Sequence, residues 1–231
     1  MKCALEPMAV QKALREYINS IFHYSGTYKL ILSMKRAGSL PIIPNVEQIT
    51  IDDITVDPAF LTSLMTTYPD TQSVAVFSSV VGDIPNDSPF FQIPHFYFCG
   101  PSLCGPDYIH NFFGRNLYLG KVTCTDQDLI QFLQKWISNE GYHNLETMTI
   151  TTDYTINQDL IRQAIEHEKY DPNKPGKRPE FLMFDIPYLG SNPTKWRIRS
   201  RIAVEIKRIA DGKRAFLAMY KCYFNFLVYN T

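Results

Sequence analysis

Four possible zinc ligands lie close together in the middle of the sequence, so zinc binding is the first chemistry to consider. His95, Cys99, Cys104 and His110 fall within sixteen positions, and imidazole and thiolate groups are the ligands that Zn²⁺ prefers in proteins. Their spacing contains neither the C-x2-C pair nor the H-x3-5-H pair of structural zinc sites. His95 and Cys99 also fall at outward positions of a predicted strand. The sequence therefore predicts core or surface residues here, and no metal site.

Cys124 is the second candidate for chemistry, as a nucleophile. It comes just before a predicted helix, whose dipole would lower the pKa of a thiol, and His143 follows as a possible base. No residue can be assigned as the acid that orients the base, and no group as an oxyanion hole. Cys124 is more simply a small residue at a strand-to-helix corner. Because the chain also has no glycine-rich phosphate loop and no H-E-x-x-H motif, we predict a non-enzymatic protein without a cofactor.

The overall composition is that of an ordinary globular chain and selects no charged partner. Of the 231 residues, 45% are hydrophobic and 20% are charged, and 23 basic side chains balance 23 acidic ones. This balance provides no overall field that would attract nucleic acid or an anionic membrane. From Lys195 to the end there are nine Lys or Arg residues and two acidic ones, which makes this part +7 and the preceding part −7. We predict that these charges cover a solvated strand face.

The start of the sequence and its cysteines indicate a reducing compartment. The opening MKCALEPMAV carries Glu6 and Pro7 where a secretory signal would have its apolar run. Five cysteines are an odd and sparse set, unlike the even sets of disulfide frameworks. The most apolar stretch, 215–229, is too short to span a bilayer and contains Lys221. We therefore expect a cytoplasmic or nuclear protein.

A short strand pattern recurs along the chain. NVEQITI at 45–51 and NLETMTI at 144–150 both read Asn, apolar, Glu, any residue, apolar, Thr, apolar. The same spacing of inward positions recurs between these two copies and, less perfectly, before them. The middle positions of the six copies are 30, 49, 74, 96, 117 and 148, so their separations are 19, 25, 22, 21 and 31 residues. Most of these steps are close to the period of leucine-rich repeats, whose L-x-x-L-x-L strands stack in parallel.

The repeated pattern predicts an α/β fold with an irregular leucine-rich-repeat-like curved parallel sheet and helices on one side. An ordinary βαβ protein is the alternative, because short apolar alternation alone fits other α/β topologies as well. Three longer connecting helices are predicted, together with a short segment of one or two turns, PDYIHNFF at 106–113. One begins after Asp57, one begins at Thr125 with a capping box to Asp128 and ends at Gly141, and one begins at Asn157.

Three parts can be distinguished along the chain. Residues 1–24 are predicted to form an N-terminal helix that caps the open end of the core, and residues 25–168 form the repeat-like strand–helix arc. Residues 169–231 begin with the polar connector KYDPNKPGKRPE. We expect the strands that follow to be antiparallel, to close the C-terminal end of the sheet and to pack on the arc. Their predicted segments are 202–206, 215–220 and 222–229.

The best-defined helix lies in a segment that resembles a known family. LYLGKVTCTDQDLIQFLQKWISNEGYHNLETMTI, residues 117–150, is similar to the core of the F-box-associated domain, type 2, of the large nematode family of F-box proteins. That family shows an apolar strand, a Thr/Asp cap, a helix ending in FL..W and then LE.L.I. The matching residues are Leu117, Leu119, Thr125, Asp128, Leu129, Phe132, Leu133, Trp136, Leu145, Glu146 and Ile150. The family's closing I.R..DG..A pattern is matched by Ile206, Arg208, Asp211, Gly212 and Ala215.

The resemblance covers roughly residues 20–229 and implies a receptor of two parts. An N-terminal F-box would dock on the adaptor of an SCF ubiquitin ligase, and the present domain would hold the protein substrate. This sequence shows no evident F-box, because one predicted helix precedes the first strand and Leu40-Pro41 leads into a strand. We therefore expect a substrate-recognition domain, with the adaptor as a partner only if an F-box lies upstream. The alternative is a freestanding protein-binding scaffold or competitor that never enters the ligase.

The predicted binding residues are those of the concave face. In such an arc the side chains between the apolar positions point to that face, in one row at Thr50, Ala75, Tyr97, Tyr118 and Thr149. A second row beside it consists of Gln48, Ser73, His95, Asn116 and Thr147. Because aromatic side chains on adjacent strands are typical of interface hot spots, the predicted partner-binding residues are Phe77, His95, Tyr97, Asn116 and Tyr118. The alternative is an accidental mixture of strand-favouring residues.

Overall fold

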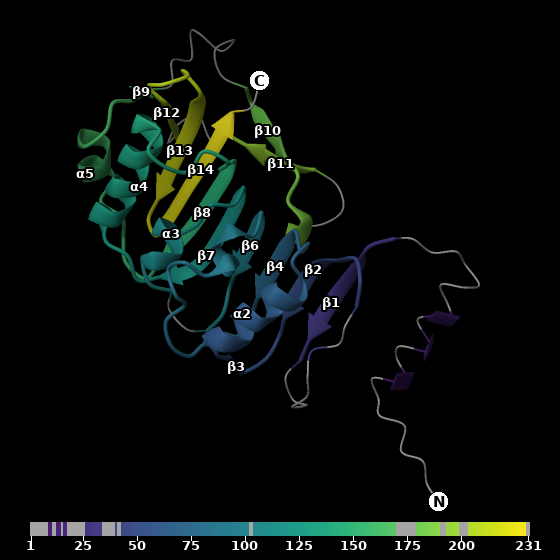
Figure 1. Cartoon of the computed structure of the whole chain (residues 1–231). Coiled ribbons are helices and arrows are strands. Elements are labelled where there is room, and N and C mark those ends of the chain that lie inside the picture. The colour runs from purple at the N-terminus through teal and green to yellow at the C-terminus, as the bar shows by residue number, and fades with distance from the viewer. Residues whose placement is uncertain are drawn as a thin grey trace, which may run out of the picture.

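A ten-stranded mixed sheet forms the centre of the molecule in the computed structural model (Figure 1). Its strand order is β1-β2-β4-β6-β7-β8-β14-β13-β12-β9, and two two-stranded sheets lie beside it, β10-β11 and β3-β5. The structure describes residues 9–10, 13–14, 16–17, 26–33, 40, 43–101, 104–169, 179–189, 193–198 and 203–229. The chain is therefore α/β, as predicted.

Six consecutive strands of the large sheet run parallel. They are β1 (Tyr28–Leu32), β2 (Val46–Ile51), β4 (Ser73–Val76), β6 (His95–Phe98), β7 (Asn116–Val122) and β8 (Thr147–Thr152). The residues that lie opposite one another across these strands are Leu30, Ile49, Val74, Phe96, Leu117 and Met148. These are the six predicted middle positions, and the last five are at most 1% exposed. The predicted register is therefore confirmed. A slip of one residue would instead have moved every apolar side chain of a strand to the other face of the sheet.

The C-terminal strands are antiparallel, as predicted. They are β12 (Ala203–Lys207), β13 (Arg214–Tyr220) and β14 (Tyr223–Tyr229), followed at the sheet edge by the short β9 (Glu168–Lys169). The order of these strands in the sheet was not predicted. The last strand, β14, pairs with β8 and so lies between β8 and β13, with β12 farther toward the edge. The composition of β14 explains this position. Its side chains are buried on both faces, with Phe226 on one and Leu227 on the other, which suits an interior strand.

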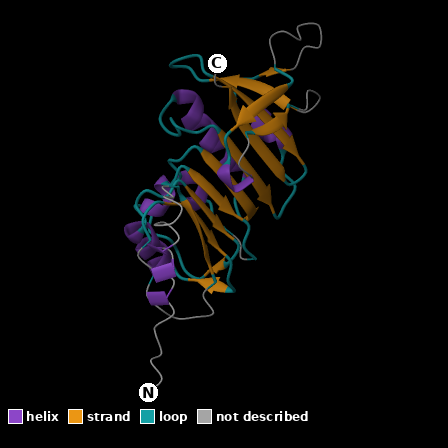
Figure 2. Ribbon diagram, turned by 90° about the vertical axis from the view of Figure 1, so that its right-hand side faces the viewer, coloured by secondary structure: helices purple, strands orange, loops and turns teal. Residues whose placement is uncertain are grey.

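The helices lie on one side of the large sheet (Figures 1 and 2). They are α2 (Pro58–Thr67), α3 (Asp107–His110), α4 (Asp126–Ser138) and α5 (Gln158–Gln163), with a 3₁₀ turn η1 (Pro89–Gln92). The predicted capping box of α4 is confirmed: Asp128 N donates to Thr125 Oγ1 at 3.2 Å, and Thr125 N donates to Asp128 Oδ2 at 2.7 Å. Asn139, at φ 63°, ends this helix two residues before Gly141, because asparagine also tolerates the left-handed conformation. None of the helices described here is long and apolar enough to cross a membrane.

We call the face of the large sheet that lies opposite the helices the open face. A second hydrophobic core covers part of the open face. The segment β10 (Phe181–Phe184), η3 (Pro187–Leu189) and β11 (Thr194–Arg197) turns back over it. Leu182 and Phe184 pack there against Phe216 and Leu227 of the large sheet. The connector after residue 168 therefore leads into a cover for the open face, which the sequence did not predict.

The side chains of the N-terminal segment are exposed where the structure describes them. Val10, Leu14 and Tyr17 are apolar residues that such a cap would turn toward the core, and they are 49%, 56% and 64% exposed. Most of residues 1–24 lie outside the described part of the chain. Capping of the core by this segment therefore stays a prediction.

The basic C-terminal part is more strongly paired than a solvated strand face would be. Arg214 makes a bidentate contact with Glu205, at 2.6 and 3.0 Å, and Arg208 contacts Asp211 at 2.7 Å. Glu205 and Arg208 are buried. Lys207 pairs with Glu168, and Arg197 with Glu180. The prediction of a solvated face is thus wrong for Arg208, because its ion pair with Asp211 allows its burial. Arg214 is only partly exposed.

Candidate functional site

The open face carries the two rows of side chains that the sequence predicts. Thr50, Ala75, Tyr97, Tyr118 and Thr149 lie opposite one another on β2, β4, β6, β7 and β8. Gln48, Ser73, His95, Asn116 and Thr147 form the row beside them, nearer the amino ends of the strands. The strand register therefore places four of the five predicted binding residues, His95, Tyr97, Asn116 and Tyr118, on this face.

His95 and Asn116 are buried in a hydrogen-bonded network and present no free surface. Asn116 is 0% exposed and His95 5%. The Asn116 amide nitrogen lies 3.0 Å from His95 Nδ1 and donates to the backbone oxygen of Asp185 at 3.4 Å. The hydroxyl of Thr147 donates to Asn116 Oδ1 at 2.7 Å. The segment around Asp185 covers His95 and Asn116, so they do not lie on the exposed part of the open face. That they contact a partner stays a prediction.

Burial also makes His95 sensitive to acid. Its pKa lies below the ordinary value of 6.5, because burial disfavours the charged imidazole and the nearby Arg115 guanidinium adds repulsion. The unfolded chain therefore binds a proton at a higher pH than the folded chain does. The stability contributed by neutral His95 is present above pH 6.5 and is lost as the pH falls through the folded pKa.

We expect the urea midpoint of the wild-type chain to fall between about pH 7.5 and about pH 5. His95→Gln removes this titrating group, so its midpoint should fall less over the same interval. Both chains are compared by fluorescence-monitored urea unfolding. An equal fall in the two chains would show that other groups cause the pH dependence.

Tyr97 and Tyr118 form the centre of an aromatic cluster on the open face. Their rings stack with centroids 4.5 Å apart at 16°. Tyr188 of η3 lies 4.9 Å from Tyr97, and Phe77 lies 5.5 Å from Tyr97 on the other side. Burial, with a smaller contribution from Cys99, raises the pKa of Tyr97 to about 12. The hydroxyl is thus a neutral hydrogen-bond donor at physiological pH.

A third row extends this cluster along the carboxyl ends of the strands. Phe77 N donates to Ile51 O at 2.9 Å and Cys99 N to Val76 O at 2.9 Å, so both residues continue the ladder beyond β4 and β6. Tyr223 lies opposite Thr151 at the end of β8. Phe77 is 41% exposed, Tyr223 is 48% exposed and Cys99 is also exposed. We call Phe77, Tyr97, Tyr118, Tyr188 and Tyr223 the aromatic patch.

Two members of the aromatic patch could not be found from the sequence. Tyr223 joins it because β14 pairs with β8, and Tyr188 joins it because η3 folds over the sheet. Both depend on contacts between distant parts of the chain, and no local pattern marks either residue. Phe77, Tyr97 and Tyr118 were predicted, because the repeated strand spacing gives their face directly.

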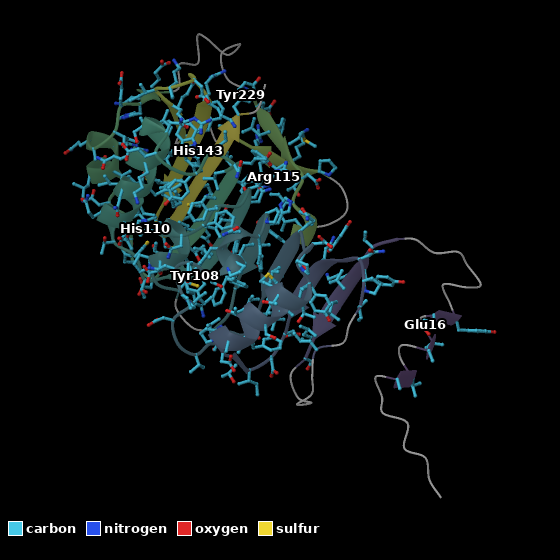
Figure 3. The ribbon with its side chains drawn as sticks, viewed as in Figure 1. Glu16, Tyr108, His110, Arg115, His143 and Tyr229 are labelled. Carbon is cyan, nitrogen blue, oxygen red and sulfur yellow. The ribbon has the colours of Figure 1, made fainter. Side chains whose placement is uncertain are left out.

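The possible zinc ligands do not come together. His95 and Cys99 lie on the open face. Cys104 is buried, and its backbone forms an isolated parallel β-bridge with Val122. His110 lies on α3 (Figure 3), where its Nε2 is 3.3 Å from Asp128 Oδ1. Among the residues that the structure describes, no group of three or more His, Cys, Asp or Glu side chains could hold a metal ion.

Cys124 and His143 are not arranged for nucleophilic catalysis. Cys124 precedes α4 and His143 follows it, and thirteen helical residues span about 20 Å. Burial and the nearby Asp128 carboxylate raise the pKa of Cys124 to about 12. The surroundings of Cys124 therefore do not favour the thiolate that a nucleophile needs. His143 instead contacts the Asn139 side chain at 3.1 Å, so the pair cannot exchange a proton.

Comparison with known proteins does not assign the chain to a family. No protein-family model matches it, and neither a curated protein nor a solved structure was found to be similar to it. The function of the chain therefore depends on the chemistry of its site, since a fold alone does not specify a function.

Proposed function

We propose that the chain is a non-enzymatic protein-recognition domain and that the aromatic patch binds its partner. The observation that carries this proposal is the arrangement of five aromatic rings on one side of the sheet. Phe77 and Tyr223 are exposed, while Tyr97, Tyr118 and Tyr188 are half-buried and hold one another in place. Aromatic side chains dominate interface hot spots. Rings that are fixed before binding lose little conformational entropy when a partner arrives.

The parallel part of the sheet supports this reading. Neighbouring strands lie about 4.8 Å apart, so residues in register present their side chains at a regular spacing. We propose that β1 to β8 form an irregular leucine-rich-repeat-like arc, supported by the common register and by the repeated steps of 19 to 31 residues. Such arcs commonly bind other proteins through the strand face.

The resemblance to the F-box-associated domain gives the proposal its biological setting. We propose that the chain recruits a protein substrate in the manner of an SCF ubiquitin-ligase receptor. A freestanding scaffold that binds the same kind of partner outside the ligase is the alternative. The two differ in one observable respect, because only the first brings the SCF adaptor into the complex.

The variant Phe77→Ser/Tyr223→Ser tests the aromatic patch. We expect it to weaken partner binding about tenfold or more, because two exposed aromatic contacts are removed. Its free energy of unfolding should change by less than about 1 kcal/mol, since both side chains are more than 40% exposed. The measurement is quantitative mass spectrometry of proteins that co-purify with the tagged chain at its native locus, followed by calorimetry with the purified partner.

A matched control removes two exposed apolar side chains elsewhere. Ile209 lies in the turn between β12 and β13 and is 79% exposed, and Leu160 lies on α5 and is 45% exposed. Ile209→Ser/Leu160→Ser should keep the partners of the wild-type chain. Retention of the same partners by the folded patch variant would contradict the proposed site. Co-purification of the SCF adaptor would assign the chain to the ligase, and its absence would favour the freestanding scaffold.

A further inference from the structure

Exposed apolar residues continue beyond the aromatic patch at the carboxyl ends of β2 and β4. The short strands β3 (Thr55–Val56) and β5 (Ser79–Val80) pair there in parallel. Ile54 and Val81 flank them and are 75% and 62% exposed. Asp53 N donates to the side chain of Ser78 at 2.9 Å, so this corner lies directly beside Phe77. Ile54, Phe77 and Val81 are therefore exposed apolar residues at the same end of neighbouring strands, and we call them the corner surface. Exposed apolar residues that lie close together are typical of interaction sites.

Acidic side chains lie beside the corner surface, in a stretch of the sequence that contains no basic residue. Residues 37–114 contain eight Asp or Glu and neither Lys nor Arg. Asp52 and Asp53 follow β2, and Asp57 precedes α2. Gly82 lies against Pro58, which brings Asp83 to the same corner. In the part of the chain that is described, no ion pair involves any of these four carboxylates.

We propose that the corner surface binds a segment of the partner protein that is rich in Lys or Arg and carries apolar side chains. This inference rests on the proposed function and specifies the chemistry of the bound segment. Ile54 and Val81 would bury the apolar side chains and the aliphatic stems of the basic ones. The Phe77 ring can accept a cation on its face. The four carboxylates then supply the charge complementarity that selects the partner and its orientation.

The basic end of a second copy of this chain fits the corner surface less well. Arg197, Lys207, Arg208 and Arg214 are each paired within the chain. Lys195 lies over the Phe181 ring at 3.8 Å, and Lys221 lies over the Tyr220 ring at 5.5 Å. A second copy would have to give up these contacts to use any of these six side chains. A foreign basic segment has no such cost.

The test uses the full chain and a fluorescein-labelled peptide that alternates Lys with Leu, followed by fluorescence anisotropy. A second peptide has Gln at every Lys position. We expect the Lys peptide to bind and the Gln peptide to bind at least about tenfold more weakly. Asp52→Asn/Asp53→Asn/Asp83→Asn should weaken the Lys peptide about tenfold or more. Asparagine preserves the acceptor that Asp53 Oδ1 offers to Ile54 N at 2.6 Å, so the corner should keep its shape.

A control with the same change of net charge separates a local site from a general field. Asp70→Asn/Glu140→Gln/Glu166→Gln neutralises three exposed carboxylates away from the corner surface and should bind the Lys peptide as the wild type does. An equal loss in both triple variants would overturn the inference. Equal binding of the two peptides would also overturn it, and so would a failure of the Lys peptide to bind. Self-association of the wild type that the corner variant abolishes would overturn it as well.

The cellular partners distinguish this inference from the proposed function. If Phe77→Ser/Tyr223→Ser loses the partners while the corner variant keeps them, the aromatic patch is right and the basic segment is wrong. If both variants lose the same partners, and those partners compete with the Lys peptide, the inference is supported. If neither variant loses any partner, both proposals fail.

Discussion

A chain carrying Trp136→Ala is expected to lose about 3–5 kcal/mol of its free energy of unfolding. Trp136 is fully buried on α4, and its ring packs edge-on against Phe226 of β14 at 5.0 Å. The guanidinium of Arg208, itself buried, lies 5.3 Å from the same ring. Truncation would leave a large cavity and remove the surface that shelters this cation. Since most domains are stable by only about 5–15 kcal/mol, this loss is a large fraction of the total stability.

The loss is measured by urea unfolding, with Trp136→Phe as the matched control. Phenylalanine keeps an aromatic ring beside Phe226 and fills most of the space, so it should cost clearly less than alanine. Trp136 Nε1 has no hydrogen-bond partner among the groups described, so no hydrogen bond is lost in either variant. A difference of less than about 1 kcal/mol between the two variants would show that ring packing is not what holds α4 to β14.

Asn116→Ala is expected to cost about 2–4 kcal/mol, because it leaves buried groups without partners. The Asn116 side chain contacts His95 Nδ1, accepts a hydrogen bond from the Thr147 hydroxyl and donates one to the backbone oxygen of Asp185. A methyl group can replace none of these contacts. The last of them joins the cover to the sheet, so the variant should also be cleaved faster by protease between β10 and η3.

Thr147→Val is the control for Asn116, because it removes one hydrogen bond of the network and leaves the other two. It should cost about 1 kcal/mol and leave the rate of cleavage between β10 and η3 unchanged. Urea unfolding and limited proteolysis measure the two effects separately. If Asn116→Ala unfolds at the wild-type urea concentration, the network contributes nothing to stability.

Local pattern was enough to predict the parallel strands and the best helix. The apolar positions at Ile49, Val74 and Phe96 lie opposite one another because each strand has one face to bury, and only one register buries all of them. The capping box of Thr125 and Asp128 was predictable because both partners lie within one turn of helix. In both cases the interactions that decide the structure are short in sequence or repeated along it.

Contacts between distant segments account for what the sequence did not reveal. His95 and Asn116 alternate with apolar residues as surface positions do, and only the later segment around Asp185 buries them. Tyr223 reaches the aromatic patch through the pairing of β14 with β8. The acidic composition around the corner surface is visible in the sequence, but its position beside Phe77 requires the contact between Asp53 and Ser78. Pairings over such separations leave no periodic signal.

The strand that comes last in the sequence, β14, lies in the interior of the sheet, between β8 and β13. This position has a consequence for synthesis on the ribosome. The chain emerges with β8 complete, but the strand that covers the edge of β8 is made after β9, β12 and β13. Until residue 229 has left the exit tunnel, β8 offers an unpaired row of backbone groups, which is a template for association with other chains. A nascent chain stalled before β14 should therefore engage chaperones or aggregate, whereas release of the last hairpin should let the sheet close.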